Sequence, residues 1–109
     1  MKIIYIAGPY RAENRWLLEK NIRNAENAAF VLANDGWVPL CPHTSYRFFD
    51  GTLTDEFWIE GTLELLRRSD AVFVCEGWEN SEGTKGEIRE ATKLGIPVFF
   101  DLKTVPKPV

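Results

Sequence analysis

The chain has 109 residues, of which 45% are hydrophobic and 27% charged, and its formal net charge is −3. Its length fits one small domain and its composition fits a folded globular protein, while an acidic charge with no basic run longer than Arg67-Arg68 argues against a DNA or RNA polymer as partner. The apolar stretches are only a few residues long, which argues against a membrane as partner.

The first half of the chain predicts two strands, one helix and a long loop. Residues 2–7 form a continuous β-branched and apolar run, which is typical of a strand buried on both faces. Residues 12–34 show helical spacing, and Gly36 is expected to end this helix in the left-handed conformation. Residues 37–40 predict a short second strand, and residues 41–53, which lack a period, predict a functional loop. The helix is expected to bury the apolar residues Leu18, Ile22, Ala25, Ala29 and Leu32.

The second half of the chain continues to alternate between helices and strands. It predicts a helix over 54–68, a buried strand over 71–75, a polar loop over 76–81, a helix over 84–94 that Gly95 caps, and a strand over 96–100. Gly61 weakens the middle of the first helix. The inward positions of the two helices are expected to be Phe57, Leu65, Leu66, Ile88, Ala91 and Leu94. Residues 103–109 contain two prolines and are expected to form a tail after a domain that spans 1–102.

This alternation predicts the α/β class, because strands joined through helices pair in parallel with right-handed crossovers. We expect a single three-layer α/β domain with a parallel sheet of about four strands. Ligands of such sheets bind beyond the carboxyl ends of the strands. That edge carries residues 8–11, 41–53 and 76–87, so the candidate site is assembled from three loops far apart in the sequence.

The cysteine and histidine content gives little support to a metal or Cys/His catalytic site. Cys41 and Cys75 lack a CxxC spacing, and His43 is the single histidine. We therefore expect buried free thiols, no metal and no cofactor. The first residues superficially resemble a signal sequence, but the apolar run ends at Gly8-Pro9 after five residues, so we expect a strand there and a cytoplasmic protein.

The turn from Ser81 to Glu87 follows the third predicted strand and has two interpretations. Gly83 and Gly86 keep side chains away from a helix start, so its amides and the Ser81 hydroxyl can bind a phosphate or another anion. The turn does not match a Walker loop, which needs GxxxxGK[ST]. Alternatively, Thr84 and Glu87 match a capping box, in which Glu87 ties back to the Thr84 amide.

Other candidate ligand-binding residues lie at the same edge. Gly8 and Pro9 follow the first strand, where a glycine lets a ligand approach the backbone, although the further glycines of GxGxxG are missing. Tyr5 is either a core residue or, if its hydroxyl reaches the carboxyl edge, a group that orients a carboxylate. His43 and Trp78 lie in the edge loops and either stack on a base or cover the core. Four carboxylates on the helix over 54–68 are expected to face solvent: Asp55, Glu56, Glu60 and Glu64.

Several of these segments resemble the nucleoside 2-deoxyribosyltransferase-like superfamily. The resemblance covers nearly the whole chain, and residues 70–98 are its most specific part. In length the chain is most similar to a small bacterial and phage branch, and in its site motif to 2′-deoxynucleoside 5′-phosphate N-hydrolase. The stretches that carry the resemblance are Ile4-Tyr5-Ile6-Ala7-Gly8-Pro9, Arg68-Ser69-Asp70-Ala71-Val72, Gly77-Trp78, Ser81-x-Gly83-x-x-x-Glu87 and Ala91-x-x-x-Gly95-Ile96-Pro97-Val98.

The resemblance implies a flavodoxin- or Rossmann-like parallel sheet with the strand order 2-1-3-4. It also implies chemistry at the N-glycosidic bond of a nucleoside or nucleotide. It implies that Glu87 is a nucleophile at the anomeric carbon, that Tyr5 orients it, and that Ser81 and Gly83 hold a 5′-phosphate. It also implies a homodimer or a higher homo-oligomer.

One position departs from the family pattern, because the aspartate linked to general acid work is replaced by Thr62. Glu60 or Asp55 could replace this aspartate as the general acid.

Three functional hypotheses follow from the sequence. They are an N-glycosidase or deoxyribosyltransferase-like enzyme, a non-catalytic nucleotide or nucleotide-sugar binding module, and a domain retained for assembly.

Overall fold

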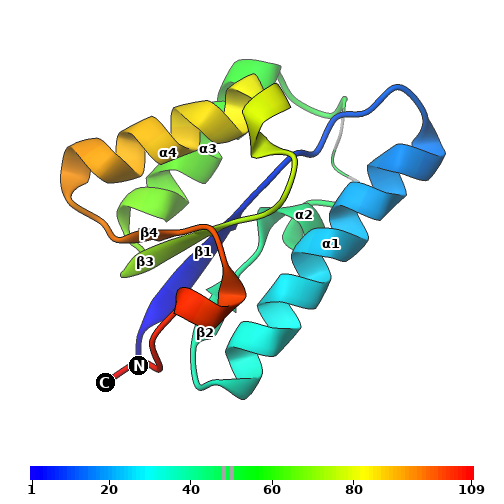
Figure 1. The fold of residues 1–109 in the computed structure, drawn as a ribbon. Helices are drawn as coiled ribbons and strands as arrows, with labels where there is room; N and C mark the ends of the chain where they lie inside the picture. The colour runs from blue at the N-terminus through cyan, green and yellow to red at the C-terminus, as the bar shows by residue number, and fades with distance from the viewer. Residues whose placement is uncertain (48, 50) are drawn as a thin grey trace.

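The centre of the structure, a computed structural model that describes residues 1–47, 49 and 51–109, is a four-stranded parallel sheet (Figure 1). Its strands are β1 (Ile3–Ala7), β2 (Val38–Leu40), β3 (Ala71–Val74) and β4 (Val98–Phe99). β1 pairs in parallel with both β2 and β3, and β3 pairs in parallel with β4. The strand order is β2-β1-β3-β4, so the predicted fold class and order are confirmed.

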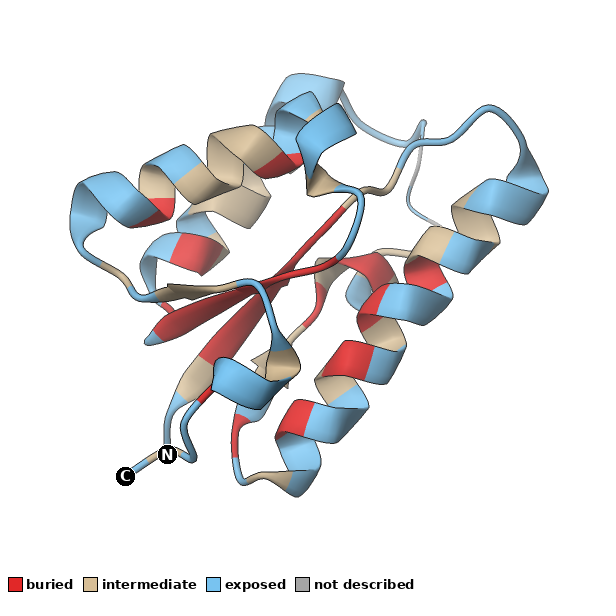
Figure 2. Ribbon diagram, in the orientation of Figure 1, coloured by how far each residue is buried: buried red, intermediate tan, exposed pale blue. Residues whose placement is uncertain are grey.

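The helices form one layer on each face of this sheet (Figure 1). One layer contains α1 (Arg15–Asn34) and the short α2 (Pro42–Ser45). The other layer contains α3 (Asp55–Arg67) and α4 (Glu82–Leu94), which pack on each other. Buried residues concentrate on the strands and on the helix faces turned toward them (Figure 2).

β1 divides its side chains between the two layers, because successive side chains of a strand point to opposite faces. Ile4 and Ile6 belong to a core cluster with residues of α1. Tyr5 and Ala7 belong to a second cluster with Leu66 of α3 and residues of α4. Tyr5 therefore points into the α3/α4 layer and not into the α1 layer.

Short helical segments replace two of the predicted loops. α2 takes up part of the predicted loop over 41–53, in which residues 48 and 50 lie outside the described residues. Its first residue is Pro42, whose fixed φ suits the first turn of a helix. A 3₁₀ turn, η1 (Trp78–Asn80), occupies the predicted polar loop that follows β3.

Some of the predicted inward positions are wrong. Phe57 is 53% exposed because it lines an open cavity on α3, and Leu94, the last residue of α4, is 49% exposed. In α1, Ala28 is buried in the core, and the predicted Ala29 is partly buried and packs against it. The acidic residues of α3 face solvent, as expected.

The C-terminal residues that were predicted to form a tail pack on the α1 side of the domain. A 3₁₀ turn, η2 (Leu102–Thr104), leads to Val105, which is buried in the same core cluster as Ile4. The Trp37 indole nitrogen donates a hydrogen bond to the Pro106 carbonyl oxygen at 2.9 Å. These contacts attach the end of the chain to the loop before β2.

Candidate active site

A tyrosine–glutamate pair joins the central strand to α4. Tyr5 lies in β1 and is 1% exposed, and its hydroxyl donates a short hydrogen bond to the Glu87 carboxylate. Glu87 lies in the second turn of α4 and is itself partly buried. The pair exists because the alternation of β1 sends Tyr5 toward the helix that carries Glu87. The structure thus brings together two residues that are 82 positions apart in the sequence.

Burial changes the acidity of both groups. Loss of solvation raises the pKa of Glu87 to about 7, against the opposing effect of the hydrogen bond from Tyr5. Burial, followed by the nearby charge of Glu87, raises the pKa of Tyr5 well above its usual value. Near neutral pH Glu87 is therefore a mixture of carboxylate and carboxylic acid, while Tyr5 stays protonated and able to donate.

The start of α4 is capped by Ser81 and not by Thr84. The Ser81 hydroxyl oxygen accepts a hydrogen bond from the Thr84 amide at 3.2 Å and lies 2.8 Å from the Thr84 hydroxyl. The predicted capping box of Thr84 and Glu87 is therefore wrong: the helix begins two residues earlier, and Glu87 binds Tyr5 instead. Gly83, in the first turn, is exposed, and an added Cβ would meet nothing within 4 Å.

His43 contacts the loop that follows β1. Its ring is 7% exposed, and Nε2 lies 3.0 Å from the Pro9 carbonyl oxygen. The Tyr10 ring packs edge-on to it, with centroids 5.8 Å apart. Burial lowers the pKa of His43, which favours the neutral ring. These contacts hold the Pro9 backbone in place; stacking of this ring on a base stays a prediction.

Gly8 and Trp78 also have structural explanations. A Cβ on Gly8 would lie 2.8 Å from the Cβ of Cys75, so only glycine lets the ends of β1 and β3 approach this closely. Trp78 packs on the α3/α4 core cluster and on the Phe100 ring at a centroid distance of 5.2 Å. Gly77, at φ +87°, lies beside Pro9, so the loops after β1 and β3 meet. A contact of these residues with ligand stays a prediction.

Thr62 lies beside the Tyr5–Glu87 pair. Its hydroxyl interacts with the Tyr5 hydroxyl and lowers the pKa of that tyrosine, and it donates to the Trp58 carbonyl oxygen at 2.9 Å. Neither proposed substitute acid joins the pair: Asp55 forms an exposed ion pair with Arg11 at 2.8 Å, and Glu60 is exposed. Thr62, at the position where the resemblance implies an aspartate, therefore places a hydroxyl next to the pair.

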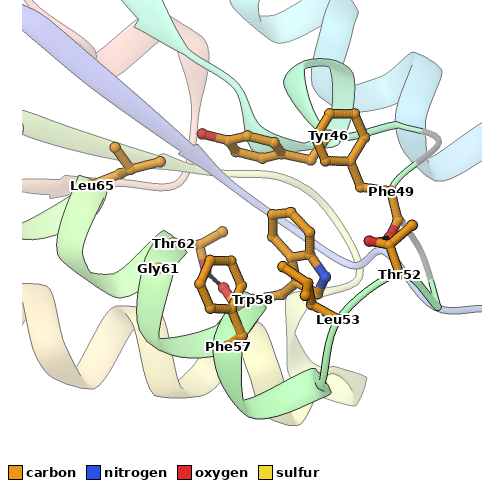
Figure 3. Close-up of a pocket in the computed structure, with 9 residues that line it drawn as sticks. All are labelled: Tyr46, Phe49, Thr52, Leu53, Phe57, Trp58, Gly61, Thr62 and Leu65. Carbon is orange, nitrogen blue, oxygen red and sulfur yellow. Dashed lines mark hydrogen bonds between the residues drawn. The ribbon is translucent and has the colours of Figure 1, made fainter.

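An open cavity of about 740 Å³ adjoins Thr62 (Figure 3). It lies between α3 and the segment before it. Its lining residues are Tyr46, Phe49, Thr52, Leu53, Phe57, Trp58, Gly61, Thr62 and Leu65. Tyr46, Phe49, Phe57 and Trp58 give it an aromatic wall. None of the site residues predicted from the sequence lines this cavity, and the density of aromatic residues over 46–58 is the sequence signal that points to it.

The described part of the chain supports neither a metal site nor a membrane-spanning helix. There, no three or more His, Cys, Asp and Glu side chains gather in a way that could hold a metal ion. No helix within the described residues has the length and apolar character needed to cross a membrane. Cys41 and Cys75 are both buried and free.

Comparison with known protein families shows to which family the chain belongs. A family model described as "Domain of unknown function (DUF7768)" matches residues 2–101. The chain belongs to this family. No curated protein matches the sequence of this chain significantly.

The chain is also similar in structure to a solved enzyme structure. That enzyme is a 2-deoxyribosyltransferase from the psychrotolerant bacterium Bacillus psychrosaccharolyticus, described as a biocatalyst for the synthesis of antiviral and antitumoral nucleosides. It superposes with a TM-score of 0.63 and 25% sequence identity, over 88% of this chain and 69% of that one. The superfamily resemblance seen in the sequence is thereby supported, whereas the particular branch stays a prediction.

Proposed function

We propose that this chain cleaves or transfers the N-glycosidic bond of a (deoxy)nucleoside 5′-monophosphate, with Glu87 as nucleophile. The observation that carries the proposal is the hydrogen bond from the buried Tyr5 hydroxyl to the Glu87 carboxylate, next to an open cavity. The similarity to a 2-deoxyribosyltransferase supports chemistry of this kind.

The proposed reaction has two steps. The ionised Glu87 carboxylate bonds to the anomeric carbon while the C–N bond breaks and its electron pair leaves with the base, which takes up a proton. Water or a second base then attacks the same carbon, and the carboxylate leaves. Water gives hydrolysis, and a second base gives transfer. Tyr5 orients the carboxylate oxygen through both steps.

The first turn of α4 is the proposed phosphate site. Backbone amides at a helix start favour an anion, and the exposed Gly83 leaves space for one. Ser81 adds a hydroxyl at the same place, although that group also caps the helix. The proposal assigns the phosphate here because Ser81 caps α4 and Glu87 lies in its second turn, so both groups belong to the start of the same helix.

The test measures, by chromatography, how fast the protein releases free base from deoxynucleoside 5′-monophosphates. The wild-type protein is expected to release base, and Glu87→Ala to lose at least about 10³-fold in rate. Glu90→Gln is the matched control, because Glu90 is on the same helix but pairs with Arg67 at 2.6 Å, away from Tyr5. Full activity in Glu87→Ala would contradict the proposal.

A non-catalytic nucleotide-binding module is the second candidate, and the observation that favours it is Thr62 beside the pair where the family pattern has an aspartate. In that case the wild-type protein binds a nucleotide without releasing base. Glu87→Ala then keeps the affinity within about tenfold, or 1.4 kcal/mol. Titration and base release measured on the same samples separate the two functions.

A further inference from the structure

The outer face of α1 exposes large aromatic side chains. The residues that this helix buries lie on its inner side, and Figure 2 shows the outer side in pale blue. On the outer side Trp16 is 80% exposed and Phe30 is 70% exposed. About four helical turns separate the two rings, so both lie on one stripe along the helix. Exposed aromatic residues that share one face are typical of an interaction surface.

A shallow cavity of about 420 Å³ lies beside Trp16 on this stripe. Among the residues that line it, Trp16, Glu19, Lys20 and Arg23 have the spacing i, i+3, i+4 and i+7. Four residues spaced in this way form the hole into which one side chain of a facing helix inserts in knobs-into-holes packing. Arg47 closes one side of the hole through an ion pair with Glu19 at 2.6 Å. The cavity therefore has the form of a hole for an apolar side chain.

Phe30 is the matching knob on the same stripe. It lies about 16 Å along α1 from the middle of the hole, at a rise of about 1.5 Å per residue, so a chain cannot insert its own Phe30. A second copy that packs antiparallel on α1 can do so. A two-fold axis between positions 24 and 25 places Phe30 of each copy opposite the hole of the other. Such a contact uses the same patch twice and closes on itself.

The charges on the stripe are complementary in the same arrangement. Arg23 and Glu26 form an ion pair at 2.6 Å within one chain. With the axis between positions 24 and 25, position 23 of one copy lies at the level of position 26 of the other, on the same side of the contact. Each guanidinium thus meets a carboxylate of the other copy as well as its own. A register with Arg23 opposite Arg23 brings like charges together, so charge favours the register that fills the holes.

We infer that two copies of this chain associate through the outer faces of their α1 helices, with Phe30 of each copy inserted beside Trp16 of the other. The inference goes beyond the proposed function and does not rest on it, because Tyr5 and Glu87 lie in the α3/α4 layer on the other face of the sheet.

The contact is expected to be weak. One helix from each copy buries an area at the small end of specific interfaces, below roughly 1,200 Å² in total. We therefore expect a dissociation constant between about 10 µM and 1 mM.

Phe30→Glu is the first test, because it removes the knob and places a carboxylate beside Glu19. Sedimentation equilibrium from about 10 µM to 1 mM should show dimers of the wild-type protein and at least tenfold weaker association of this variant. Ile59→Glu is the matched control, since Ile59 is an apolar residue of α3 that is 55% exposed. It should associate as the wild type does. Association that is lost in Ile59→Glu and kept in Phe30→Glu would assign the contact to α3 and overturn the inference.

Charge reversal tests the register. Arg23→Glu and Glu26→Arg should each weaken self-association at least tenfold, because each variant places like charges opposite one another across the axis. An equimolar mixture of the two should associate within about threefold of the wild type. In the mixed pair the new carboxylate at position 23 faces the new guanidinium at position 26, and the native pair remains at the second contact.

Recovery in the mixture cannot come from a folding defect, because both variants are defective alone. The inference is overturned if the mixture stays monomeric, if Phe30→Glu associates as well as the wild type, or if the wild-type protein is a monomer at about 1 mM. None of these outcomes bears on base release, so the proposed function is tested separately.

Discussion

The two faces of the central sheet are formed by the same strands but differ in their chemistry. On the α1 face, β1 contributes Ile4 and Ile6 to a cluster of apolar side chains. On the α3/α4 face it contributes Tyr5, whose hydroxyl binds the partly buried Glu87 beside an aromatic cavity. One face is thus packed from apolar side chains alone, whereas the other buries polar groups at an energetic cost, and such groups with shifted pKa values are typical of functional sites.

The largest effect on stability is expected on the α1 face. Ile6 is fully buried there, so Ile6→Ala should lower the free energy of unfolding by about 2–5 kcal/mol through lost transfer energy and a cavity. Urea unfolding measures this change. An NMR titration of the Glu87 carboxyl should show the same pKa as wild type. A shifted titration would mean that the two faces are coupled through β1.

The pH dependence of stability should come from the other face. The pKa of Glu87 is raised to about 7 in the folded chain, so its contribution to stability is complete below about pH 4.5 and is lost as the pH rises toward 7. Glu87→Gln has no such titration. The difference in unfolding free energy between the two proteins should change by about 3 kcal/mol across this range, in favour of the variant at high pH.

Urea unfolding of both proteins at several pH values between 4.5 and 8 measures that difference, and the other titrating groups cancel between them. A difference independent of pH would show that Glu87 is not desolvated as the structure indicates.

A smaller effect is expected from Tyr5→Phe, which removes the hydroxyl and keeps the ring. A hydrogen bond to a charged group contributes about 1.5–3 kcal/mol, so base release should fall roughly tenfold to a hundredfold. The hydrogen bond from Tyr5 lowers the pKa of Glu87, so its loss should move the rising limb of the pH–rate profile to higher pH. A rate loss without this movement would assign Tyr5 to packing alone.

The smallest effects compare one helix cap on each face. Ser81→Ala and Asn14→Ala each remove a cap, of α4 and α1, and each should lower the unfolding free energy by about 1 kcal/mol. If Ser81 also holds phosphate, only Ser81→Ala should weaken binding of a nucleoside monophosphate relative to its nucleoside. Equal effects of both variants on that ratio would remove Ser81 from the phosphate site.

Much of the fold was predictable because local patterns agree with the tertiary arrangement. The β-branched run of β1 and the helical spacing of α1 both produced the expected elements. The errors occur where a neighbour decides between local alternatives. Thr84 and Glu87 have the spacing of a capping box, but Ser81 caps the helix and Tyr5 takes the carboxylate. Distinguishing these options needs the position of β1, which lies far away in the sequence.

The sequence by itself determined the alternating α/β architecture and the edge at which a site is expected, because these follow from periodicity and connection rules. Through a family resemblance it also gave the strand order and singled out Tyr5 and Glu87. Only the tertiary structure decided that the Tyr5 hydroxyl donates a hydrogen bond to Glu87, that burial raises the pKa of Glu87 to about 7, and that an aromatic cavity lies next to the pair. The physical reason is that burial and contact are properties of neighbours in space, and the residues that surround Glu87 come from β1, α3 and α4.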